Sequence, residues 1–250
     1  IIDNPHRDIP LVTALASPVF DISPEADFTP YAHLAASQMP SKLTATALKG
    51  RFLDLEAAEQ TPQQTRNPAR FRLPQFQKQV QLTGTARGSA THLFMQFARY
   101  EACRTMEGIE AELLRQRDEK FLTPEQAQSV HADQIYRLFS SEFGARILGA
   151  QTLRREFKFS ILTDAASYAP QAAGEQVMLQ GVVDCFWIED GGIVLVDFKT
   201  DRTPNGPAAK AAQYAPQLRA YAGALSRMYQ LPVKEQILYF FDCGCAYHLE

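Results

Sequence analysis

Two apolar segments joined by a short turn constrain the fold of this chain more than any other feature. Residues 176–188 (QVMLQGVVDCFWI) and 193–198 (IVLVDF) each have the pattern of a strand, and residues 189–192 (EDGG) have the composition of a tight hairpin turn. If the strands pair across this turn, Asp184 and Asp197 lie together at one end of a sheet. Carboxylates held close together inside apolar strands repel each other unless a cation binds between them.

Lys199 adds a positive charge to the same predicted site. It follows Asp197 by two positions, and side chains at that spacing on a strand point to the same face. An ammonium group there can orient a water molecule and offset the charge that builds up on a phosphate during reaction. Hard oxygen ligands suit Mg²⁺ or Mn²⁺ better than zinc. We therefore predict a catalytic core of Asp184, Asp197 and Lys199 that binds a divalent metal.

The rest of the sequence predicts an α/β fold in which helices flank a mixed central sheet. Further strands are expected at 152–162 and 236–241, and helices are expected after Ser89 and at 107–116, 123–130, 132–139 and 208–229. Gly84 and Gly88 are expected to flank a turn before the first helix. Residues 1–80 are typical of a partly irregular connector, with a short ordered segment at 41–55, and the domain itself is expected to span residues 81–250.

Composition limits the classes of protein that remain. The formal net charge of -3 and the pI near 6.0 argue mildly against nucleic acid as a partner, although a carboxylate-rich metal site lowers the pI by itself. No apolar run approaches the roughly 20 residues of a membrane span, and the sequence does not open on a secretory signal. We therefore expect no membrane association and a cytoplasmic location.

The four cysteines lack the C-x2-C pairs of a structural zinc site and the spacing of an iron–sulfur site. Four reduced thiols and no iron–sulfur cluster are therefore expected. Cys243 and Cys245 leave a second interpretation open, a labile metal site or a redox pair.

These motifs resemble those of RecB-family nucleases, within the PD-(D/E)XK class. Gly181-Val182-Val183-Asp184 and Val196-Asp197-Phe198-Lys199-Thr200 look like the family's G-x-x-D and D-Y-K-T segments, with Phe198 in place of the commoner tyrosine. Three further segments are similar to the family's first motif, its arginine–glutamate strand and its Q-x3-Y helix: Gly84–His92, Arg155-Glu156-Phe157 and Gln217-x-x-x-Tyr221. Their order and spacing most resemble the C-terminal nuclease domain of AddA subunits of AddAB helicase–nucleases, over about residues 84–248.

The resemblance implies a restriction-endonuclease-like core that hydrolyses DNA phosphodiesters with Mg²⁺, for which Mn²⁺ can substitute. It further implies an exonuclease acting on single strands fed by a helicase, in double-strand-break repair and recombination. The implied metal ligands are His92, Asp184, Asp197 and the Phe198 carbonyl. The implied DNA contacts come from Gln217, Tyr221, Glu156 and Arg155. The implied partners are a single-stranded DNA end, the helicase portion of a longer parent chain and a second, AddB-like subunit.

Other interpretations remain open from the residues alone. The domain could be a catalytically silent module of the same fold that binds DNA or a partner protein, which a missing ligand would indicate. Glu156 could be a surface acid paired with Arg154, and Tyr221 could belong to the core. Asp201 and Arg202, just after Lys199, could form a salt bridge or contact a phosphate.

Overall fold

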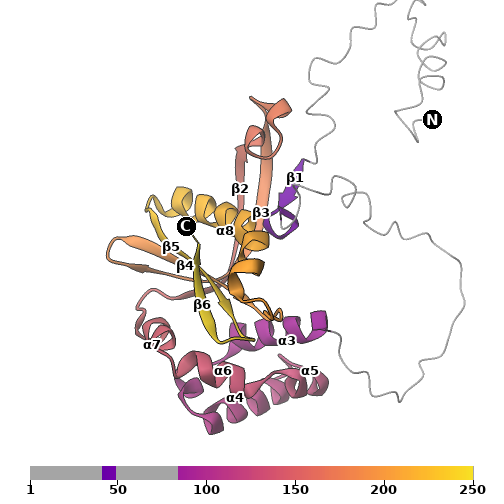
Figure 1. Cartoon of the computed structure of the whole chain (residues 1–250), viewed down its shortest axis with the longest axis vertical. Coiled ribbons are helices and arrows are strands. Elements are labelled where there is room, and N and C mark those ends of the chain that lie inside the picture. Colours follow the sequence, from indigo (N-terminus) through magenta and orange to yellow (C-terminus); the bar gives the residue numbers. More distant parts are fainter. Residues whose placement is uncertain (1–40, 49–83, 250) are drawn as a thin grey trace, which may run out of the picture. The chain divides into compact units, whose positions relative to one another are not determined.

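The computed structural model describes residues 41–48 and 84–249, which form an α/β fold around a mixed sheet (Figure 1). The strands are β1 (Lys42–Thr44), β2 (Arg154–Asp164), β3 (Gln176–Glu189), β4 (Gly192–Lys199), β5 (Val233–Phe240) and β6 (Cys245–Leu249). The α-helices are α3 (Gly84–Phe97), α4 (Met106–Asp118), α5 (Pro124–Ser129), α6 (Ala132–Phe139), α7 (Glu142–Gly149) and α8 (Pro207–Tyr229). The 3-10 helices are η1 (Ala45–Leu48), η3 (Tyr100–Arg104), η4 (Ala165–Ser167) and η5 (Pro170–Ala172).

The strand order is β1-β3-β4-β5-β6, and β2 pairs with β3 off this path. Strands β3 and β4 form the predicted antiparallel hairpin, whose turn has φ of 49° at Asp190 and 73° at Gly191. A two-residue turn with positive φ at both positions has a backbone twist that matches the right-handed twist of the flanking strands. Strand β5 runs parallel to β4 after the α8 crossover, and Asp197 is level with Leu238. The mixed sheet of the sequence prediction is confirmed.

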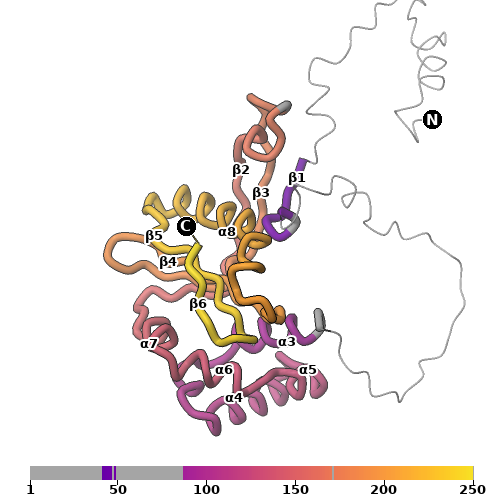
Figure 2. The backbone as a smooth tube through the Cα atoms, in the orientation of Figure 1, coloured from indigo at the N-terminus to yellow at the C-terminus, as the bar shows by residue number. Residues whose placement is uncertain are grey.

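Helices cover both faces of the sheet, with α3–α7 gathered on one side and α8 on the other (Figure 2). Alternate residues of β3, β4 and β5 explain this division, because successive strand side chains point to opposite faces. Trp187, Val196 and Tyr239 pack into one core cluster with Phe94 and Ile135 of the helical side. On the opposite face, the ring of Phe240 meets that of Tyr214 from α8 edge-on.

The first helix begins earlier than the sequence predicts. Gly84 and Gly88 lie inside α3 rather than on either side of a turn. A Cβ atom at Gly88 would lie 2.8 Å from the Thr200 hydroxyl oxygen, so glycine is needed for the close approach of α3 to the end of β4. Helix α7 and strand β6 are not among the predicted elements. Gly144 lets α7 pack against the end of α6, where a Cβ atom would lie 2.1 Å from the Leu138 carbonyl oxygen.

One strand comes from the short ordered segment that the sequence predicts at 41–55, within the proposed connector. Strand β1 runs parallel to β3, with Leu43 level with Leu179, and η1 follows it directly. Residues 42–44 therefore belong to the sheet. The rest of the proposed connector, residues 1–40 and 49–80, lies outside the described residues.

Residues 164–175 belong to a second compact unit, separate from the one that holds 41–163 and 176–249. Within this segment, the Ala165 amide donates to the Glu175 carbonyl at 2.9 Å, and Asp164 caps η4 by accepting from the Ala166 amide at 2.9 Å. The segment is thus closed by its own hydrogen bonds.

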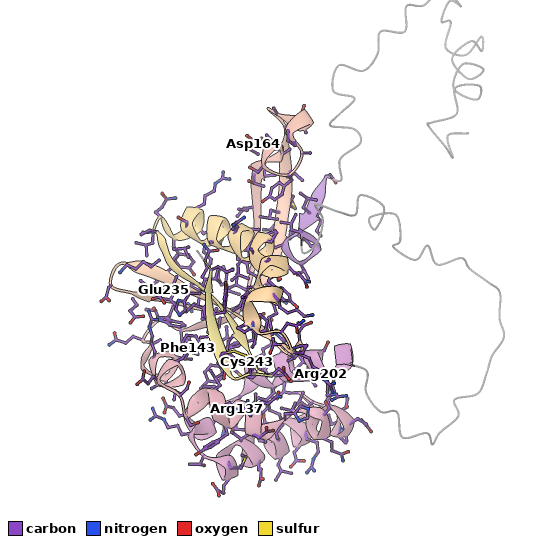
Figure 3. The ribbon with its side chains drawn as sticks, viewed as in Figure 1. Arg137, Phe143, Asp164, Arg202, Glu235 and Cys243 are labelled. Atoms are coloured by element: carbon purple, nitrogen blue, oxygen red, sulfur yellow. A yellow bond between two sulfur atoms is a disulfide. The ribbon has the colours of Figure 1, made fainter. Side chains whose placement is uncertain are left out.

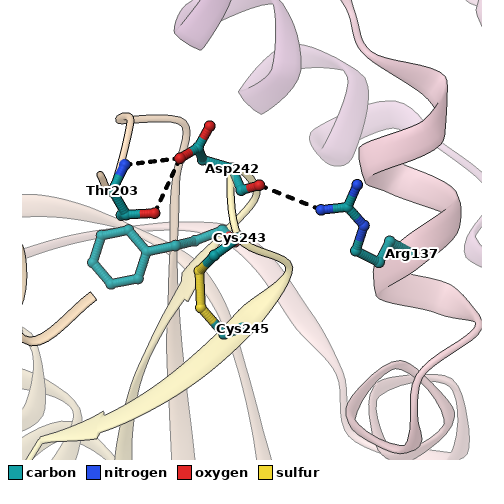
Figure 4. Close-up of a disulfide and its surroundings, with 6 residues drawn as sticks. Arg137, Thr203, Asp242, Cys243 and Cys245 are labelled. Carbon is teal, nitrogen blue, oxygen red and sulfur yellow. Dashed lines mark hydrogen bonds between the residues drawn. A yellow bond between two sulfur atoms is a disulfide. The ribbon is translucent and has the colours of Figure 1, made fainter. Parts of the chain in front are cut away.

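The turn between β5 and β6 holds a disulfide between Cys243 and Cys245 (Figure 4). The positive φ of 66° at Gly244 folds the chain so that the two Cα atoms are 5.4 Å apart, within the usual range for a disulfide. This pair corrects the expectation of four reduced thiols, whereas Cys103 and Cys185 are free and buried. No helix in the described ranges is long and apolar enough to cross a membrane.

Candidate active site

Two carboxylates meet at the end of the β3–β4 hairpin, as the turn chemistry predicts. The register that pairs Cys185 with Val196 sets Asp184 of β3 beside Asp197 of β4, one step further from the turn. Asp184 Oδ2 accepts the backbone N–H of Phe198 at 2.8 Å. The two side chains are only 12% and 2% exposed, respectively, so both negative charges are withdrawn from water.

An imidazole and a third carboxylate complete the acidic end of the site. His92 from α3 places Nδ1 3.4 Å from Asp184 Oδ2. One ligand atom each from His92, Glu156 and Asp184 lies within 4.8 Å of the others. Glu156 has a φ of 47° near the start of β2, a left-handed conformation that costs an L residue roughly 1–2 kcal/mol. Such strain is retained where the surrounding structure demands that backbone conformation.

Lys199 lies on the other side of Asp197 and is enclosed by α8. Its ammonium forms an ion pair with Asp197 Oδ2 and donates to Gln217 Oε1 at 3.4 Å. The same Nζ lies 4.3 Å from the centre of the Tyr214 ring. The amide nitrogen of Gln217 donates to the Tyr221 hydroxyl at 2.7 Å. One face of α8 therefore fixes the cation beside the carboxylates.

The site holds three carboxylates but only two groups that can carry a positive charge, His92 and Lys199. Burial raises the pKa of Asp197 to about 6, with repulsion by Asp184 adding to the effect and Lys199 opposing it. Burial and the charge of Asp184 also raise the pKa of Glu156. Burial alone would lower the pKa of His92, but attraction to Asp184 outweighs it and the pKa rises to about 8. For Asp184, attraction to His92 and Lys199 outweighs burial and lowers the pKa.

The donor set fits a divalent metal ion. A nitrogen and carboxylate oxygens from His92, Glu156 and Asp184 come within a single ion's reach of one another. Burial, together with the neighbouring carboxylates, raises the pKa values of Glu156 and Asp197, so the charged form of each is disfavoured in the protein alone. A divalent cation would favour the charged forms, and the hard oxygen donors suit Mg²⁺ or Mn²⁺.

Comparison with known proteins identifies the family. The profile of the PD-(D/E)XK nuclease superfamily matches residues 54–248. The chain belongs to this superfamily.

Among curated proteins, the chain is similar to the A subunits of ATP-dependent helicase/nucleases from several bacteria. It is 34% identical to the protein of Bacillus cytotoxicus over 224 residues, covering 85% of this chain and 18% of that one. It is 36% identical to the protein of Moorella thermoacetica over 221 residues, covering 86% of this chain and 15% of that one. The chain thus spans less than a fifth of the length of these relatives.

The structure groups the site residues predicted from the sequence in its own way. Glu156, assigned to DNA contact, lies with His92 and Asp184, whereas Asp197 is engaged by Lys199. The Phe198 side chain is 1% exposed and belongs to the core, and its backbone N–H holds Asp184. The ligand roles of Asp197 and of the Phe198 carbonyl stay predictions.

The predicted DNA contacts of this superfamily member have partners within the protein. The Arg155 guanidinium donates to the carbonyls of Met95 and Ala98 at 3.1 and 2.7 Å and stacks on Tyr100, so it ties the end of α3 to β2. Tyr221 is 2% exposed and packs edge-on against Phe159. Their contact with DNA stays a prediction.

One neighbour of Lys199, Tyr214, is not among the site residues predicted from the sequence. Asp201 accepts the Tyr214 hydroxyl and lies 3.8 Å from the Lys210 ammonium, and a phosphate contact by Arg202 stays a prediction. The sequence places Tyr214 only as one more apolar position on α8. Its spacing of three residues before Gln217, which puts both on one helical face, was the available signal.

Proposed function

We propose that this domain hydrolyses DNA phosphodiesters with a divalent metal ion. The observation that carries the proposal is the half-buried cluster of His92, Glu156 and Asp184 beside an Asp197–Lys199 ion pair. A structural cluster would balance its charges, but this one is left with surplus carboxylate. Such an arrangement costs stability and is retained where a cation and an anionic substrate are to be bound.

His92, Glu156 and Asp184 would hold the ion, with Asp197 as a further carboxylate beside them. Bound there, Mg²⁺ or Mn²⁺ would act as a Lewis acid toward a phosphate oxygen. Lys199 would stabilise the negative charge that develops on the phosphate. Its ammonium is ion-paired with Asp197 and donates to Gln217 Oε1, so the cation is held beside the carboxylates where a phosphate would be bound.

The finer parts of the proposal extend from the relatives named as helicase/nucleases. Because the chain spans less than a fifth of their length, we propose that it acts within a longer protein that supplies the helicase. In that setting it would cut single strands from an end during break repair, in contact with a second, AddB-like protein. Mg²⁺ would be the physiological ion, and the protein would work in the cytoplasm.

The deciding experiment is cleavage of end-labelled single-stranded DNA by the purified chain with Mg²⁺, with Mn²⁺ and with EDTA. Wild type and Asp197→Ala are compared, with Glu235→Gln as a control that changes a half-buried carboxylate remote from the site. Metal-dependent cutting by wild type and by the control, but not by Asp197→Ala, is expected. Equal cutting by Asp197→Ala would refute the assignment.

A second substrate tests the exonuclease part separately. Covalently closed single-stranded circles offer no end, so an exonuclease leaves them intact while it degrades the linear form. Cutting of circles at the linear rate would make the domain an endonuclease. If neither form is cut, calorimetric titration with Mn²⁺ separates two cases. Binding by wild type but not by Asp184→Asn indicates a domain that needs its parent protein, and no binding indicates a silent module.

A further inference from the structure

The ammonium of Lys199 has a neighbour that neither the motif nor the comparisons assign. Its Nζ lies 4.3 Å from the centre of the Tyr214 ring, in addition to its polar contacts with Asp197 and Gln217. The Lys199 side chain is only 12% exposed. A cation over an aromatic face is attracted more strongly when both are withdrawn from water.

The ring itself is fixed on two sides. Tyr214 is 1% exposed, and its ring contacts Phe240 edge-on with centroids 6.4 Å apart. Its hydroxyl donates to Asp201 Oδ2, and the other oxygen of Asp201 lies 3.8 Å from the Lys210 ammonium. Asp201 follows Lys199 by two positions in the chain, so the segment that carries the lysine also anchors the ring. The ring cannot turn away without breaking these contacts.

A fixed ring has a specific use in a site with surplus carboxylates. The flexible stem of Lys199 allows its ammonium to approach any of several negative groups, and Asp184 attracts it as well as Asp197. An ammonium drawn toward Asp184 would compete with a metal ion for that carboxylate. A neutral aromatic face favours the cation without adding another charge.

We propose that Tyr214 is a positioning residue for Lys199, with the ring face as the seat of the ammonium and Asp201 as the anchor of the ring. Only the expected effect on DNA cleavage rests on the proposed function. The position of the Lys199 ammonium over the Tyr214 ring does not depend on bound substrate.

The kinetic test compares Tyr214→Leu, which removes the ring, with Tyr214→Phe, which keeps it. Tyr214→Leu should lower kcat by about tenfold to thirtyfold, as expected for loss of a desolvated cation–π contact, with KM for DNA changed less than about twofold. Tyr214→Phe should stay within about threefold of wild type. Asp201→Asn, which keeps an oxygen that can accept the Tyr214 hydroxyl, should also stay within about threefold of wild type. Tyr136→Leu, at an exposed tyrosine of α6, is the matched control and should match wild type.

A double-mutant cycle separates positioning from general damage to the fold. In a Lys199→Ala background, Tyr214→Leu should cause no further loss, because the group through which it acts is gone. Multiplicative losses in the double variant, or a kcat for Tyr214→Leu equal to wild type, would overturn the proposal.

A spectroscopic test needs no activity. With ¹³C-labelled lysine, the Cε resonance of Lys199, assigned by its disappearance in Lys199→Arg, should be shifted upfield by the ring current of Tyr214. The shift should persist in Tyr214→Phe and vanish in Tyr214→Leu. An unchanged resonance in Tyr214→Leu would overturn the proposal even in a protein that cuts DNA. If wild type does not cut, the proposed function fails, and this resonance still decides whether the seat exists.

Discussion

The strands that carry the site bear a second charge cluster near the β3–β4 turn, and the two clusters differ in kind. Near the turn, Arg146 of α7 donates to Glu189 of β3 at 2.9 Å and to Glu235 of β5 at 3.0 Å. Glu235 is labelled in Figure 3. Trp187 also donates to Glu189 at 2.9 Å. These three charged side chains are 27–37% exposed. In the site, Asp184 and Asp197 are almost completely buried.

The pKa values show what the difference means. The Arg146 guanidinium holds the pKa of Glu189 and of Glu235 below the usual carboxyl range, so each charge near the turn is stabilised by its surroundings. In the site, burial raises the pKa of Asp197 and Glu156 instead. The first cluster is an interaction that stabilises the fold. The second keeps its carboxylates at an energetic cost, which a bound cation would remove.

The largest expected effect is that a substitution in the site impairs DNA cleavage but not stability, whereas a substitution near the turn impairs stability but not cleavage. Asp197→Asn should reduce DNA cleavage by at least about a thousandfold, because the site loses a charge that meets the reacting groups. Its melting temperature should be unchanged or higher, since burial disfavours the charged form of Asp197. Glu235→Gln should cleave at the wild-type rate but melt earlier. Cleavage assays and calorimetric melting of both variants measure these effects, and a cleavage defect in Glu235→Gln would break the distinction.

Metal binding should stabilise the protein through the site alone. At a concentration of Mn²⁺ one hundred times the Kd, binding adds about 2.7 kcal/mol to the free energy of unfolding, which raises the melting temperature by several degrees. Asp184→Asn should lose the rise, and Arg146→Gln should keep it. Thermal melting with and without Mn²⁺ measures both. A rise in Asp184→Asn equal to that of wild type would place the ion elsewhere.

Acid should affect the cluster near the turn in a defined direction. Glu189 and Glu235 have lower pKa values folded than unfolded, so their contribution is complete above the ordinary carboxyl pKa of 4.5 and is lost as the pH falls. Arg146→Gln should cost about 1–2 kcal/mol near neutral pH, because two partly exposed carboxylates lose their partner and solvent screens each pair. The difference from wild type should shrink below pH 4.5. Urea unfolding at several pH values tests this, and a difference that grows in acid would contradict it.

The smallest effect on DNA cleavage is expected for the disulfide in the turn between β5 and β6, which belongs to neither charge cluster. Replacing Cys243 and Cys245 with serine opens a very short loop, which costs about 1.5 kcal/mol in the chain-entropy description. Asp242 in the same turn accepts the N–H and hydroxyl of Thr203, in the loop after Lys199, and these bonds do not need the disulfide (Figure 4). Cleavage should therefore stay within about twofold of wild type. A tenfold loss would make this turn part of the site.

The sequence predicted the parts of the site that local chemistry determines. The Asp190–Gly191 turn fixes the hairpin register, and the register brings Asp184 and Asp197 together. The position of Glu156 beside Asp184 could not be predicted from the sequence. Strand residues normally alternate between the two faces of a sheet, and the positive φ of Glu156 interrupts that alternation.

Contacts between distant parts of the chain explain the remaining errors. The position of Gly88 inside α3 depends on Thr200, which no local pattern reveals. Tyr214 looked like core because a buried aromatic residue has the same periodicity whether or not a lysine lies over its ring. Long-range packing therefore decided what the motifs left open.

The short strand β1 has a consequence for how this nuclease can be handled as a piece of protein. It contributes an edge to the sheet beside β3, and the hydroxyl of Thr46, just after it, interacts with that of Tyr221 on α8. A truncation that starts at α3 would discard this strand and leave the backbone of residues 178–180 without its partner. Exposed strand edges recruit other chains. The choice of N-terminal boundary thus becomes a choice between a monodisperse preparation and one prone to self-association.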